Sequence, residues 1–225
     1  MANEWIDDNP TVHFRFGAIM YTDLAFSLYT NAEKKKYPFF VNLTDNVDAV
    51  QKFINKSVPK FSSIRFASDW ESGYFVLLNK MNWDEDAEKI VVHMSHVPGH
   101  GRGYTMVIKL HSKYFLIPKY KKNRKENFEI YKKMQDSYRV KMSKKITELA
   151  QNNFKFYCLN GNQNSSFCFK RVSDNFIRNG GKKFVIKDLF GYSYDKDDDE
   201  SIDKETLKDQ FDDFFSNIIK SCVND

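Results

Sequence analysis

The chain has 225 residues, a formal net charge of +5, and 21 Phe, 12 Tyr and 3 Trp. With 41% apolar residues, 9 Gly and 5 Pro, its composition excludes collagen-like, linker-like and disordered proteins. A chain of this length can bury about 70% of its unfolded surface, so a large aromatic core is expected.

The first half of the chain predicts strands around one helix. Residues 11–22 and 24–29 are rich in aromatic and β-branched types, and 39–41 form a short apolar run. A helix is expected to begin at Thr44 or Asp45 and to end before Pro59, with apolar residues at helical spacing. Further strands are predicted at 61–67, 73–80 and 88–96.

The second half predicts two long amphipathic helices. The loop 97–103 is expected to turn strand 88–96 back onto 103–110, and 112–118 follows as another strand. Residues 126–151 carry one apolar stripe at steps of three and four. The step Asn160-Gly161-Asn162 predicts a hairpin between strands 154–159 and 165–172, and strand 183–188 precedes a helix at 202–222.

Strands that follow one another in runs favour an antiparallel arrangement. We therefore expect a single α+β domain over 1–225, with a largely antiparallel mixed sheet packed by three amphipathic helices. Residues 195–201 are expected to form a flexible acidic linker to the last helix.

The charges are strongly separated along the sequence. Residues 109–145 hold 13 Lys/Arg and 3 Asp/Glu, a net charge of +10, whereas residues 195–213 hold 10 acids and 3 Lys, a net charge of −7. Lysines interleaved with tyrosines can neutralise phosphates and stack on bases, so we expect a nucleic-acid-binding surface. The residues predicted to form it are Lys119, Lys121, Lys122, Arg124, Lys125, Lys132, Lys133, Arg139, Lys141, Lys144 and Lys145.

Other interpretations of these charges remain open. The basic residues can form a solvated helix face, pair with the acidic segment of the same chain, or lie on an anionic membrane surface. The acidic segment 195–213 can in turn dock on a basic protein partner.

Three histidines lie within eight residues, which indicates a candidate catalytic cluster of His93, His96, His100 and Arg102. Alternation along 88–96 places His93 and Ser95 on one side of the strand. Histidines could exchange protons with a phosphodiester that Arg102 holds, or bind a metal with a remote carboxylate. His93-Met94-Ser95 resembles half of the two-histidine phosphoesterase signature, but no second H-x-[ST] step stands at a matching distance.

Apart from the metal alternative for the histidine cluster, no motif in the chain predicts a metal or a cofactor, and none is expected. Three cysteines without C-x-x-C spacing are typical of a reduced compartment, the acidic N-terminus does not resemble a secretory signal, and no apolar run approaches the ~18 residues of a membrane span. We expect a cytoplasmic protein, more consistent with binding than with catalysis, whose partner is a nucleic acid or a nucleoprotein. A host-defence, counter-defence or mobile-element protein would fit this sequence, and a phosphodiesterase or nuclease is the alternative.

Overall fold

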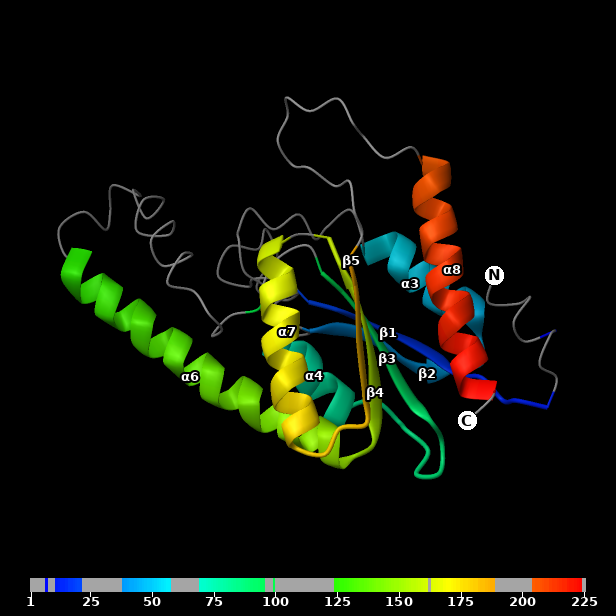
Figure 1. The fold of residues 1–225 in the computed structure, drawn as a ribbon, viewed down its shortest axis with the longest axis horizontal. Helices are drawn as coiled ribbons and strands as arrows, with labels where there is room; N and C mark the ends of the chain where they lie inside the picture. The colour runs from blue at the N-terminus through cyan, green and yellow to red at the C-terminus, as the bar shows by residue number, and fades with distance from the viewer. Residues whose placement is uncertain are drawn as a thin grey trace.

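The structure, a computed structural model, describes Asp7, 11–21, 38–57, 69–95, Gly99, 124–161, 163–188 and 204–223. These ranges contain five strands and five helices (Figure 1). The strands are β1 (Phe16–Met20), β2 (Phe39–Thr44), β3 (Lys89–Ser95), β4 (Phe154–Asn160) and β5 (Lys183–Asp188). The helices are α3 (Val47–Ser57), α4 (Trp70–Asn79), α6 (Arg124–Gln151), α7 (Gln163–Arg178) and α8 (Lys204–Val223).

The main sheet is parallel, so the prediction of a largely antiparallel sheet was wrong. Its strand order is β3-β4-β5, with Lys89 opposite Phe154 and Ser95 opposite Asn160. Strands alternate with helices here, since α6 precedes β4 and α7 joins β4 to β5. Among the described strands, β1 and β2 alone pair antiparallel, in a separate two-stranded sheet.

Two helices were mistaken for strands, which explains the error in the sheet. Predicted strand 73–80 lies in α4, and predicted strand 165–172 lies in α7. The first contains the apolar run 74–78 and the second the shorter run 167–169, and apolar runs this short do not distinguish a buried helix from a strand. In α7 the buried residues Cys168, Val172 and Phe176 recur every four positions, which is the helical period.

The predicted hairpin at Asn160-Gly161-Asn162 was also wrong. The backbone N–H of Gly161 donates to the carbonyl of Ser95, at 3.1 Å, and the chain then enters α7. The turns after the two crossover helices each contain a residue with positive φ, Asn153 at 57° and Gly180 at 91°. This left-handed conformation lets the backbone leave each helix and start the next strand.

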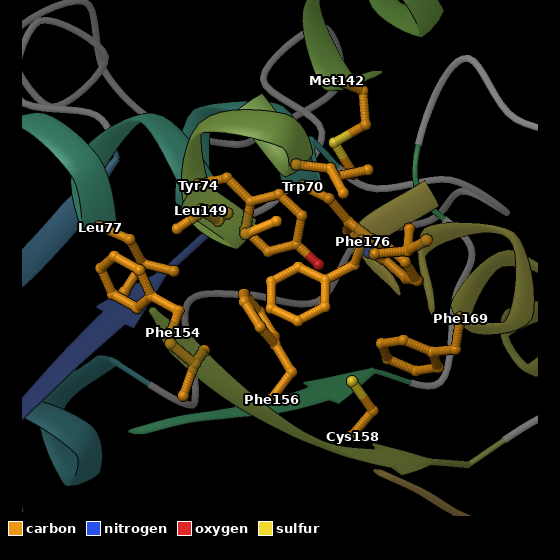
Figure 2. Close-up of a cluster of buried hydrophobic side chains, with 14 of the residues drawn as sticks. Trp70, Tyr74, Leu77, Met142, Leu149, Phe154, Phe156, Cys158, Phe169 and Phe176 are labelled. Carbon is orange, nitrogen blue, oxygen red and sulfur yellow. The ribbon is translucent and has the colours of Figure 1, made fainter. Parts of the chain in front are cut away.

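Both faces of the parallel sheet are covered by helices. Along β4, Phe156 and Cys158 point into a core formed with α4, α6 and α7, which Figure 2 shows. The alternate residues Tyr157 and Leu159 point to the other face, where α8 covers them. Figure 1 shows α8 on the side of the sheet opposite to α4 and α7.

The helices predicted at 45–58, 126–151 and 202–222 are confirmed as α3, α6 and α8. Predicted strands 24–29, 61–67, 103–110 and 112–118 lie outside the described residues, as does the acidic linker 195–201. The loop predicted at 97–103 is described only at Gly99.

Candidate functional site

The predicted basic residues differ in how much of them the structure describes and in their exposure. Lys119, Lys121 and Lys122 lie outside the described residues, and Arg124, Lys125 and Lys132 belong to α6, where only the backbone is described. The side chains of Lys133, Arg139, Lys141 and Lys144 are exposed on α6, as predicted. That of Lys145 is only 17% exposed and forms an ion pair with Glu148, at 3.3 Å.

Helix α7 adds basic side chains that the sequence-based prediction missed, because this segment was interpreted as a strand. Lys170, Arg171 and Arg178 are exposed on α7. The two helices pack against each other, and the Asn175 side-chain amide donates to the Ser143 hydroxyl, at 3.1 Å. The exposed sides of α6 and α7 together are called the α6–α7 basic surface.

This surface carries a clear excess of positive charge. Among the described side chains of α6 and α7 there are eight Lys/Arg and three Asp/Glu. They are Lys133, Arg139, Lys141, Lys144, Lys145, Lys170, Arg171 and Arg178 against Asp136, Glu148 and Asp174.

The acidic helix α8 lies on the other face of the sheet. Its Phe214 and Ile218 are buried against Tyr157 and Leu159, whereas α6 and α7 pack on the opposite side of β4. Since the sheet separates them, the described part of the acidic segment does not cover the α6–α7 basic surface.

Two phenylalanine rings accompany the cations. Phe75 of α4 is 39% exposed, and the Lys145 ammonium lies 5.2 Å from its ring centre. Phe167 of α7 is 48% exposed, and the Arg171 guanidinium lies 4.6 Å from its ring centre. Because α6 packs against both α4 and α7, these rings lie on the helices that flank α6.

His93, the one described member of the predicted histidine cluster, is buried in the core. Its Nε2 lies 2.5 Å from the Tyr21 hydroxyl and its Nδ1 lies 2.9 Å from the Tyr74 hydroxyl. One arrangement of protons makes all three hydrogen bonds possible. Tyr74 donates to Nδ1, Nε2–H donates to the Tyr21 hydroxyl, and Tyr21 donates to the Met94 carbonyl, at 3.3 Å.

This environment favours the neutral imidazole. Burial lowers the pKa of His93 to about 3 and raises the pKa of Tyr21 well above its ordinary value. The ring also packs edge-on against Trp70 and Phe169. A histidine with both ring nitrogens bonded inside the core is poorly placed to exchange protons with a substrate. His96, His100 and Arg102, its predicted partners, lie outside the described residues.

A second polar cluster lies where the three parallel strands end. The Asn160 side-chain amide donates to the Asp188 carboxylate, at 2.5 Å, and the Ser165 hydroxyl donates to the Asn160 side-chain oxygen. Ser165 also contacts the Ser95 carbonyl, at 3.3 Å. This cluster was not predicted from the sequence, because the expected antiparallel strands do not bring the carboxyl ends of β3, β4 and β5 to one edge.

Among the described residues, no group of three or more His, Cys, Asp or Glu side chains could hold a metal ion. None of the described helices is long and apolar enough to cross a membrane.

Comparison of the chain with protein-family models, curated proteins and solved structures found no match.

Proposed function

We propose that the protein binds nucleic acid through the α6–α7 basic surface. The observation that carries this proposal is that basic side chains of two adjacent helices are exposed on one side of the sheet, away from acidic α8. A cluster of exposed lysines and arginines attracts the phosphates of nucleic acids and gains affinity by releasing their counterions.

The contacts within the surface leave cations available for phosphates. The described ion pairs use Arg139, which pairs with Asp136 at 3.5 Å, and Lys145, which pairs with Glu148. Lys141 and Lys144 are exposed on the same helix, and the charge of Lys141 also acts on the Glu71 carboxylate of α4. The Arg139–Asp136 pair is exposed, and ion pairs at exposed positions contribute only about 0–1 kcal/mol, so a phosphate can compete with it.

The proposal is tested with the double variant Lys141→Glu/Lys144→Glu. We expect weaker binding of a fluorescein-labelled oligonucleotide and a shallower dependence of log Kd on log salt, because two cations near the phosphates are reversed. Each lost phosphate contact should reduce the slope by about 0.7–0.9. Fluorescence anisotropy over a range of salt concentrations measures both quantities.

The chain offers a control with the same change of net charge. Lys52 and Lys56 are exposed on α3, outside the α6–α7 basic surface. The variant Lys52→Glu/Lys56→Glu should retain most of the affinity and the wild-type salt slope. Equal losses in the two double variants, or binding by the wild type that does not change with salt, would contradict the proposal.

A further inference from the structure

We infer that the α6–α7 basic surface selects single-stranded nucleic acid, with Phe167 of α7 and Phe75 of the adjoining helix α4 as stacking sites for unpaired bases. This inference rests on the proposed function, since it names the class of nucleic acid that the same surface would bind. Its basis is the two exposed rings, each with a cation over it, on the helices beside α6.

The rings of Phe75 and Phe167 are much more exposed than the phenylalanines of the core. Most phenylalanines of the core cluster are almost fully buried, whereas Phe75 and Phe167 remain 39% and 48% exposed. Their exposed surfaces lie on helices that pack against α6, the most basic helix of the described chain. An exposed ring near phosphate-binding cations is the combination that proteins use to bind single strands.

Phe167 lies on the same side of α7 as two cations. Phe167, Arg171 and Arg178 follow one another at steps of four and seven, so they share one side of the helix. Asn175, which contacts Ser143 of α6, lies on the neighbouring side. The ring and two cations therefore share one side of α7, and a strand bound along this side would reach α6 near Asn175.

The choice between single strand and duplex follows from the chemistry of the rings. In a duplex the base faces are already stacked on one another, so a phenylalanine ring would have to unstack a step to contact them. In a single strand the base faces are free, and stacking on an aromatic side chain strengthens binding without sequence preference. Lysines alone would bind the phosphates of single strand and duplex alike, whereas the rings add affinity only for the single strand.

The test uses a fluorescein-labelled oligothymidine and a labelled duplex of equal length, with wild-type protein and Phe75→Leu, Phe167→Leu and the corresponding double variant. Leucine keeps an apolar side chain but removes the ring. We expect tighter binding of the single strand by the wild type and a loss of about five-fold or more for each leucine variant, the lower end of the contribution of one stacked base. The salt slope should not change, because no charge is removed. Phe167→Tyr keeps an aromatic ring and should therefore bind like the wild type.

Phe40→Leu is the matched control, because Phe40 is 38% exposed but lies on β2. It should bind like the wild type. If the wild type binds single strand and duplex equally and the leucine variants retain full affinity, the inference is wrong. In that case the Lys141→Glu/Lys144→Glu variant still decides the proposed function. Absence of binding to both probes would overturn both.

Discussion

His93 connects three parts of the chain through one side chain. Tyr21 directly follows β1, Tyr74 belongs to α4, and both hydroxyls reach the ring that β3 carries. Trp70 and Phe169 close the space around the imidazole. The residue that the sequence marked as a catalytic candidate therefore makes contacts that hold the core together.

The burial of His93 predicts that the protein loses stability in mild acid. The pKa of His93 is about 3 in the folded protein and near 6.5 when the chain is unfolded, so the unfolded state binds the extra proton first. The stability that the neutral ring contributes is complete above pH 6.5 and is lost as the pH falls toward 3. The expected slope is about 1.4 kcal/mol per pH unit, which amounts to about 2 kcal/mol between neutral pH and pH 5.

Urea unfolding at both pH values measures this effect, with His93→Gln as the variant that cannot titrate. Glutamine can still donate to one tyrosine and accept from the other, and its pH dependence should be shallower by the stated amount. The exposed His13→Gln serves as the control and should behave like the wild type. Equal pH dependence in wild type and His93→Gln would show that His93 is not the group responsible.

The sequence predicts the long helices better than the sheet. Helices α3, α6 and α8 have apolar stripes that extend over three turns or more, so their period is unambiguous. Helix α4 carries a nearly continuous apolar run and is capped by Asp69, whose carboxylate accepts from the backbone N–H of Ser72, at 3.2 Å. The sequence-based prediction did not use this cap, and the contacts that bury α4 depend partly on α6, which is distant along the chain.

The contact between α6 and α7 gives a second stability prediction. Ser143→Ala removes the hydroxyl that accepts from Asn175, and Asn175→Ala removes the donor. Each substitution should reduce the free energy of unfolding by about 1 kcal/mol, and the double variant should lose less than the sum of both. The expected coupling energy from urea unfolding of the four proteins is about 0.5–1.5 kcal/mol.

The variants of this cycle also provide their own control. Asn175 makes a further contact with the backbone carbonyl of Ser143, at 3.4 Å, which Ser143→Ala leaves in place. The loss in Asn175→Ala should therefore be at least as large as the loss in Ser143→Ala. Additive losses would mean that the two side chains do not interact in solution.

The parallel sheet separates surfaces of opposite charge. The mildly basic net charge of +5 combines a basic surface on α6 and α7 with an acidic helix on the other side of β4. The basic character of α6 could be predicted from its sequence alone. The contribution of α7 and the opposite location of α8 could not, because both depend on the strand order and on which side of the sheet each crossover passes.

The central position of β4 in the parallel sheet predicts that the thiols of Cys158 and Cys168 react slowly in the folded protein. Cys158 of β4 and Cys168 of α7 are 0% and 1% exposed in one core cluster, and burial raises the pKa of the Cys158 thiol. A thiol reagent needs the thiolate and physical access, so both residues should react only when the core opens.

In a Cys222→Ser variant we expect labelling by iodoacetamide to be at least about a thousand-fold slower in native buffer than in urea. Both thiols should become reactive at the urea concentration at which tryptophan fluorescence reports unfolding, because β4 lies between β3 and β5 and α7 covers it. Fast labelling of Cys168 alone in native buffer, with unchanged fluorescence, would instead show that α7 detaches from the sheet before the core unfolds.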